Sequence, residues 1–190
     1  PTLLVAGAAL LILIIQRDLG TASLFIALYT VIVYLASGKR RFLLISFLII
    51  VAALVAGYFI FDVIQIRVEA WLDPWRDANG RSYQIVQSII AVANGGIFGR
   101  GIGLGSPGVV PVAQSDFIFP SMIEETGLVG AIAIVLLYAV LTLRGFTISL
   151  KAPNQFQRFL AAGITTYFVS QALLIMGGTI RLLPLTGVTL

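Results

Sequence analysis

Three carboxylates, those of Asp116, Glu124 and Glu125, fall within ten consecutive residues at the start of an apolar run. Ionisable side chains are costly at the edge of a membrane and mark candidate functional sites there. The chain contains no histidine and no cysteine, so acid–base chemistry must use carboxylates, Lys, Tyr or Arg. The same absence argues against a zinc centre, whereas oxygen ligands for Mg²⁺ or Mn²⁺ are available.

The three acids differ in their predicted positions. Ser121 and Glu124 have the spacing of a capping box, with Ser121 as the N-cap residue of a helix and Glu124 three residues later. Glu125 would be stabilised by the positive end of the same helix. Asp116 precedes the cap and is followed by Phe-Ile-Phe. We expect it either to act in catalysis or proton handling, or to form an ion pair with an arginine of the preceding loop.

A glycine-rich segment precedes these acids. Residues 95–108, GGIFGRGIGLGSPG, hold seven glycines in fourteen positions. Their spacing does not match G-x-G-x-x-G and no strand precedes them, which argues against a dinucleotide fold. Two interpretations stay open: the backbone N–H groups cradle an anion with help from Arg100, or the segment is a structural re-entrant turn.

The elements that must position these residues are membrane helices. The 190 residues are 59% hydrophobic and 11% charged, with a mean hydropathy of +1.04, whereas soluble domains carry about 25% charged residues. A span needs about 20 mostly apolar residues, and five runs qualify, the first being short: residues 2–16, 19–37, 42–61, 120–143 and 157–177. We therefore expect an all-α polytopic membrane protein. Its single membrane domain, 1–190, would comprise three spans in 2–61, a long loop at 62–119, two spans in 120–177 and a tail at 178–190.

Charge sidedness orients these spans. The joints on one face carry six cations and no acid, whereas the other face carries six arginines and all eight acids. Because Lys and Arg in short loops favour the cytoplasm, we place the basic joints inside and the loop 62–119 and the tail 178–190 outside. The basic residues are expected to set orientation rather than to bind lipid or nucleic acid; they are Lys39, Arg40, Arg41, Arg144, Lys151 and Arg158.

The outer loop carries most of the unusual chemistry, and loops of this length without a role are uncommon. Trp71 and Trp75 are expected to anchor it at the headgroup level rather than to stack on a substrate. Residues 82–96 have a helical periodicity that predicts a helix lying along the membrane surface. Its apolar face would comprise Val86, Ile89, Ile90 and Ala93, away from Gln84, Gln87 and Ser88.

Short motifs follow one another along nearly the whole chain, each weak alone but specific as an ordered set. They are Gln16 and Asp18-Leu19-Gly20-Thr21-Ala22; Arg67 and Trp71-Leu72-Asp73-Pro74; Ser82-Tyr83-Gln84 and Gln87-Ser88; Gly95-Gly96, Phe98-Gly99, Gly101 and Gly103; Val110-Pro111; Asp116-Phe117-Ile118-Phe119; Glu124-Glu125 and Gly127; Leu183-Pro184 and Thr186-Gly187. In this order they resemble the SEDS family (shape, elongation, division and sporulation), whose best-known members are RodA and FtsW.

The chain departs from the family pattern at four positions: Arg17 (usually Pro), Gln114 (commonly His), Pro120 (usually Ala) and Thr126 (often Leu). None of these changes removes a carboxylate, but Gln114 argues against a histidine-like neighbour tuning Asp116. The resemblance implies a bundle of about ten transmembrane helices, of which this chain would cover roughly the fifth to the ninth. We therefore expect a fragment that is inactive alone.

The resemblance implies a peptidoglycan glycosyltransferase of the bacterial cytoplasmic membrane. Such an enzyme polymerises lipid II, a disaccharide-pentapeptide on undecaprenyl pyrophosphate, at the outer face, for elongation, division or sporulation. Asp116 would be the general base of an inverting transfer. A divalent cation, Mg²⁺ or Mn²⁺, on the pyrophosphate is compatible with the family, and its protein ligands are unknown. The candidate pyrophosphate or sugar ligands are Arg67, Arg81, Gln84, Gln87, Arg100, Gly101 and Gly103, and the candidate structural or supporting residues are Asp18, Glu124 and Glu125.

Two other functions are compatible with these features. A lipid-linked precursor flippase would keep the fold, the acid and the arginines but form no glycosidic bond. A non-catalytic scaffold that activates a class B penicillin-binding transpeptidase would not need Asp116. The family resembles one whose members work in complexes with such transpeptidases, so partner binding and catalysis are expected together. The expected partners are lipid II, a class B penicillin-binding protein and membrane lipid, with no nucleic acid.

Overall fold

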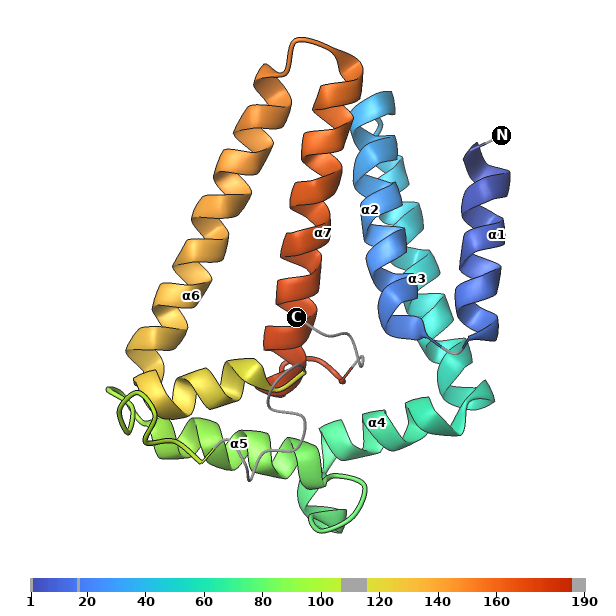
Figure 1. The fold of residues 1–190 in the computed structure, drawn as a ribbon. Coiled ribbons are helices and arrows are strands. Elements are labelled where there is room, and N and C mark those ends of the chain that lie inside the picture. Colours follow the sequence, from blue (N-terminus) through green and yellow to red (C-terminus); the bar gives the residue numbers. More distant parts are fainter. Residues whose placement is uncertain (1, 17, 107–115, 186–190) are drawn as a thin grey trace. The chain divides into compact units, whose positions relative to one another are not determined.

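A computed structural model of the chain describes residues 2–16, 18–106 and 116–185. Within them every regular element is a helix (Figure 1). In chain order the elements are α1 (Thr2–Ile15), α2 (Leu19–Ser37), α3 (Arg41–Ile60), α4 (Asp62–Leu72), the 3₁₀ turn η1 (Pro74–Asp77), α5 (Tyr83–Gly95), α6 (Ile118–Lys151) and α7 (Gln155–Thr179).

Within the described residues, four helices are long and apolar enough to cross a membrane: α2, α3, α6 and α7. They coincide with four of the five predicted spans. The remaining one, α1, has 14 residues, fewer than the roughly 17 that a span requires. The prediction of an all-α polytopic membrane protein is confirmed.

The chain forms two compact units, of which the first combines Pro1–Ala56 with Val140–Gln171. It contains α1, α2, most of α3, the second part of α6 and most of α7. Asp18 caps α2, because its carboxylate accepts the backbone N–H of Thr21 at 3.0 Å and the Thr21 hydroxyl at 2.6 Å. Such caps contribute about 1 kcal/mol. The other end of α2 is closed by Gly38, whose φ of 67° suits a helix C-cap.

In the same unit, α6 and α7 approach each other closely. Gly145 of α6 lies against Thr165 of α7 with no space for a Cβ atom, and small residues permit such contacts between membrane helices. Nearer the α6–α7 joint, the buried Ser149 hydroxyl donates to the carbonyl of Arg158 at 2.8 Å. These contacts hold the two helices together at this end.

The predicted end of the span at residue 143 is wrong for the helix, because α6 continues to Lys151. The stretch contains Arg144 and Lys151, which we assigned to a joint. Long cationic side chains can follow apolar surface while their charged heads reach water, so these residues do not end a helix. The joint is much shorter, since α7 already begins at Gln155.

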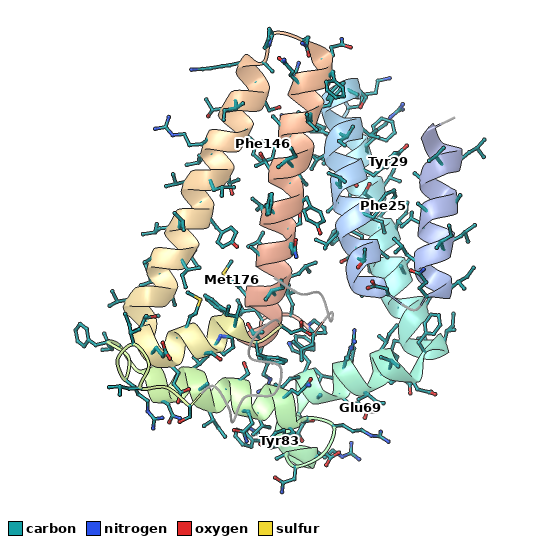
Figure 2. All side chains as sticks on the ribbon, viewed as in Figure 1. Phe25, Tyr29, Glu69, Tyr83, Phe146 and Met176 are labelled. Carbon is teal, nitrogen blue, oxygen red and sulfur yellow. The ribbon has the colours of Figure 1, made fainter. Side chains whose placement is uncertain are left out.

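The second unit combines Gly57–Ala139 with Ala172–Leu190. It holds α4, η1, α5, the first part of α6 and the end of α7. Its core packs Phe119, Ile123 and Ala131 of α6 against Ala172 and Met176 of α7. Figure 2 shows Met176 on the side of α7 that faces α6. This packing fixes the start of α6, just after the acid Asp116.

The predicted helix in the outer loop is confirmed as α5. Its predicted faces are correct at Val86, which is buried, and at Gln84, which is exposed, but they are wrong at Ser88 and Ile90. The buried residues include Ile85, Ser88, Ala91 and Gly95, whereas Ile90 is exposed. A Cβ atom on Gly95 would meet a backbone carbonyl of α6. Small residues thus let α5 pack tightly on protein, and Ser88 lies inside this contact rather than on a polar face.

Candidate active site

A pocket of about 250 Å³ lies in the second unit. It is lined by α4, the start of α5, the residues just before α6, and the end of α7 with the segment after it. Four of the residues predicted from the sequence line it together: Arg67, Arg81, Gln84 and Asp116. Figure 2 labels Glu69 on α4 and Tyr83 on α5, the two helices that carry Arg67 and Gln84.

Asp116 is held at this pocket by its neighbour Phe117. The Phe117 side chain is 2% exposed and packs on Ala91 of α5 and on Leu185. The Oδ1 atom of Asp116 is buried and has no hydrogen-bond partner among the described residues. Buried polar atoms are nearly always paired, so this oxygen is available to accept a proton or a hydrogen bond from a ligand.

Two arginines give the pocket its electrostatic character. Arg67 lies on α4 and Arg81 just before α5, and a guanidinium stays charged at every physiological pH. Two positive charges outweigh the single negative charge of Asp116. Guanidinium groups bind phosphate oxygens in a paired geometry, so the pocket suits a phosphorylated ligand beside a carboxylate.

A reciprocal pair of contacts lies close in sequence to Ala70 and Thr179, which line the pocket. The Trp71 indole N–H donates to the carbonyl of Arg181 at 3.1 Å. In return, the Arg181 guanidinium donates to the carbonyls of Trp71 and Leu72, each at 2.7 Å. Arg181 has a φ of 63°, unusual for a residue other than glycine. This arrangement binds the end of α4 to the segment after α7. Trp71 therefore has a partner within the protein, which membrane anchoring alone did not predict.

Ser88 of α5 holds the end of α7, which lines the pocket through Thr179. It is fully buried, and its hydroxyl donates to the carbonyl of Thr179 at 2.6 Å. Thr179 is the last residue of α7 and lines the pocket. Neither Ser88, Thr179 nor Arg181 was a candidate site residue. Ser88 belongs to the motif Gln87-Ser88, and this was the one signal in the sequence that pointed to it.

The glycine-rich segment fills a break in α6. Gly127 has φ 70° and ψ −167°, which interrupts the helix. The carbonyls of Glu124 and Glu125 accept the N–H groups of Arg100 at 2.9 Å and Gly101 at 3.0 Å. A Cβ atom on Gly99 would overlap the Glu125 carbonyl. These contacts favour the structural interpretation of the segment at residues 99–101, because there the N–H groups already donate within the protein.

Glu124 is not part of a capping box, and that prediction is wrong. The helix begins at Ile118, so Ser121 lies inside it and its hydroxyl donates to the Phe117 carbonyl. The Glu124 side chain is 3% exposed and forms an ion pair with Arg100 at 2.9 Å. It also accepts the N–H of Ser106 at 3.2 Å. Glu124 therefore links the glycine-rich segment to α6 at two points, Arg100 and Ser106.

The remaining candidates lie apart from the pocket lining. Arg100 is engaged by Glu124, and none of Gln87, Arg100, Gly101 and Gly103 lines the pocket that contains Asp116. Glu125 contacts the glycine-rich segment through its carbonyl and lies beside Gly105. Of the seven predicted ligand residues, the structure brings Arg67, Arg81 and Gln84 to Asp116.

Comparison with known proteins relates the whole chain to one family. The sequence pattern of the cell cycle proteins FtsW, RodA and SpoVE matches residues 1–190. Peptidoglycan glycosyltransferase RodA of Mycobacterium tuberculosis is 40% identical over 178 residues, which are 94% of this chain and 38% of that protein. Stage V sporulation protein E of Bacillus subtilis is 35% identical over 193 residues, all of this chain and 52% of that protein. The probable peptidoglycan glycosyltransferase FtsW of Geobacter sulfurreducens is 37% identical, and the match covers 52% of that protein.

A solved structure shares the fold. It was reported as "Structural coordination of polymerization and crosslinking by a peptidoglycan synthase complex", and it matches 98% of this chain with a TM-score of 0.73 and 26% identity. This chain covers 52% of the matched one. The chain thus spans about half the length, or less, of these relatives.

Proposed function

Because the chain belongs to the FtsW, RodA and SpoVE family of cell cycle proteins, we propose that it forms the catalytic half of a peptidoglycan glycosyltransferase. The substrate would be lipid II, presented at the outer face of the bacterial cytoplasmic membrane. The pocket of the second unit would face that side, as the charge distribution predicts. The observation that carries the proposal is the meeting of Asp116 with Arg67 and Arg81 in one pocket.

In the proposed reaction Asp116 acts as general base. Its carboxylate takes the proton from the 4-hydroxyl of the acceptor GlcNAc as the oxygen attacks the anomeric carbon of the donor MurNAc. The bond from that carbon to the pyrophosphate oxygen breaks, and undecaprenyl pyrophosphate leaves with the bonding electron pair. Attack from the opposite side converts the α linkage of the donor into a β linkage.

The arginines would stabilise the leaving group. Negative charge builds up on the bridging oxygen as the bond breaks, and fixed positive charges stabilise such a transition state more than the bound substrate. Arg67 and Arg81 line the pocket with Asp116, so the base and the charge stabilisation come from the same site. Gln84 offers an amide that can bind a sugar hydroxyl.

A divalent cation on the pyrophosphate is a further part of the proposal. Among the described residues no three acidic side chains lie close enough to hold a metal ion. Magnesium ions are often held by one or two carboxylates together with substrate phosphates. Because Asp116 serves as the general base in this proposal, the pyrophosphate oxygens themselves would hold the cation, which would neutralise charge on the leaving group.

We also propose a class B penicillin-binding protein as the partner. The support is the related structure, which was reported as part of a peptidoglycan synthase complex that coordinates polymerization and crosslinking. The partner matters for the test, because the chain spans about half the length, or less, of its relatives, and we propose the polymerase activity for the whole protein in its complex.

The test is Asp116→Asn in the intact protein, reconstituted with its penicillin-binding partner and with lipid II added on the outer side. Loss of a general base should lower the rate of polymer formation about 10²- to 10⁴-fold. The matched control is Asp62→Asn, which removes the same charge from an exposed position at the start of α4 and should leave the rate within about threefold, as expected for a surface position.

The outcomes separate the candidate functions. A normal polymer yield from the Asp116→Asn protein at normal expression would contradict the base assignment and favour a scaffold. Failure of the unmodified complex to form polymer from substrate already on the outer side would favour a flippase.

A further inference from the structure

A groove of about 720 Å³ lies between the second part of α6 and the first part of α7, within the first unit. Each helix contributes residues spaced three, four and seven positions apart, which place one face of each helix on the groove. On α6 these are Arg144, Thr147, Ile148 and Lys151, and on α7 they are Gln157, Leu160, Ala161 and Ile164.

The polar part of the groove is basic. Arg144 and Lys151 are both exposed, seven residues apart on the same face of α6, which corresponds to about 10 Å along the helix. A long arginine side chain on a membrane helix extends its charged head toward the interface, so both cations can reach one bound anion. The sequence from 140 to 171 contains no Asp or Glu that would neutralise them.

The rest of the groove is apolar and open. Ile148 is 62% exposed, Leu160 48% and Ile164 50%. All three belong to helices long and apolar enough to cross a membrane, so lipid chains are the expected neighbours of this surface. A free phosphate ion would use the cations alone, whereas an amphiphile with an anionic head would use the cations and cover the apolar residues.

We propose that this groove binds one acidic phospholipid, with Arg144 and Lys151 on its phosphate and an acyl chain along Ile148, Leu160 and Ile164. Basic pockets between membrane helices are known to take anionic headgroups. The sequence analysis predicts that the six cations of the basic joints orient the helices, and that role applies to all six equally. The groove distinguishes two of them, and this difference makes the proposal testable.

The experiment measures lipid binding to the intact protein in a zwitterionic detergent, by native mass spectrometry. The probes are dimyristoyl phosphatidylglycerol, dimyristoyl phosphatidylcholine and inorganic phosphate. We expect one tightly bound phosphatidylglycerol, at least tenfold weaker binding of phosphatidylcholine, and no competition by inorganic phosphate at equal concentration.

Two double variants carry the test. Arg144→Gln with Lys151→Gln should weaken phosphatidylglycerol binding roughly 30-fold, since each cation near an anionic headgroup contributes about a factor of five. The matched control, Lys39→Gln with Arg40→Gln, removes two exposed cations from the α2–α3 joint of the same unit, outside the groove. It should change binding less than threefold. Ala161→Phe fills the groove without a change in charge and should also abolish tight binding.

Each alternative has its own result. Equal losses from the two double variants would show diffuse attraction to a basic surface and overturn the proposal. Equal binding of the two phospholipids would remove the headgroup from the interaction, and competition by inorganic phosphate would reassign the groove to a free anion. Tight binding by the Ala161→Phe protein would place the lipid elsewhere, even if the charge variants fail to fold.

Discussion

Replacing Gly127 by alanine should destabilise the protein more than the same change at Gly103, although both glycines have a positive φ. Gly127, with φ 70° and ψ −167°, occupies a region that is essentially restricted to glycine and costs other residues about 1–3 kcal/mol. Its new Cβ atom would also meet the backbone N of Gly99 and the carbonyl of Ile97. Overpacking of this kind adds about 1–3 kcal/mol.

The control glycine isolates the conformational part of that cost. Gly103 has φ 77°, and no atom lies within 4 Å of the position that its Cβ would take. Only the left-handed backbone is penalised there, by about 1–2 kcal/mol. The expected losses of unfolding free energy are therefore about 2–6 kcal/mol for Gly127→Ala and about 1–2 kcal/mol for Gly103→Ala.

The assay is denaturant unfolding of the intact protein in detergent micelles, followed by the fluorescence of Trp71 and Trp75. Both tryptophans lie in the second unit with Gly127. An equal loss from the two variants, or a smaller loss at Gly127, would refute the reasoning. It would mean that the glycine-rich segment does not occupy the break in α6.

Two further predictions concern polar contacts of the second unit. Arg100→Met and Glu124→Gln, made singly and together, should show a coupling of about 0.5–3 kcal/mol in unfolding free energy, because the two groups are 2.9 Å apart; strictly additive losses would argue against the ion pair. Ser88→Ala should cost about 1–3 kcal/mol, since it leaves the Thr179 carbonyl unpaired. Ser23→Ala, whose hydroxyl bonds a carbonyl of its own helix, should stay within about 0.5 kcal/mol in the same denaturant titration.

The membrane helices could be predicted from the sequence because span length and hydropathy are properties of one segment. Helix ends were predicted less well. The residues from Arg144 to Lys151 look like a joint by charge, but long cationic side chains are compatible with a helix. Residues 62–72 were assigned to a loop although Asp62, in the first turn of α4, is a typical helix-start signal.

In the site, too, individual residues could be selected from the sequence, whereas contacts between residues far apart in the sequence could not. Arg67, Arg81 and Asp116 were selected from the sequence and do line one pocket. Glu124 was assigned to a cap because its spacing from Ser121 fits that pattern. Its partner in the structure is Arg100, 24 positions earlier, and no short-range pattern reveals such a pair. The helix begins at Ile118, directly after the buried Phe117, so Ser121 is not in the cap position.

The contact between Trp71 and Arg181 also sets an order of events during synthesis. The two residues are 110 positions apart, and a ribosome adds about 5–20 residues per second. The end of α4 therefore waits roughly 5–20 s for its partner, a time in which α6 and α7 are translated. Until then Ala70 of α4 and Thr179 of α7 cannot line one pocket together, and the pocket cannot bind a ligand. A nascent chain would thus acquire this pocket only after its last described helix has been made, so a partly synthesised protein could not yet bind the ligand that we propose for it.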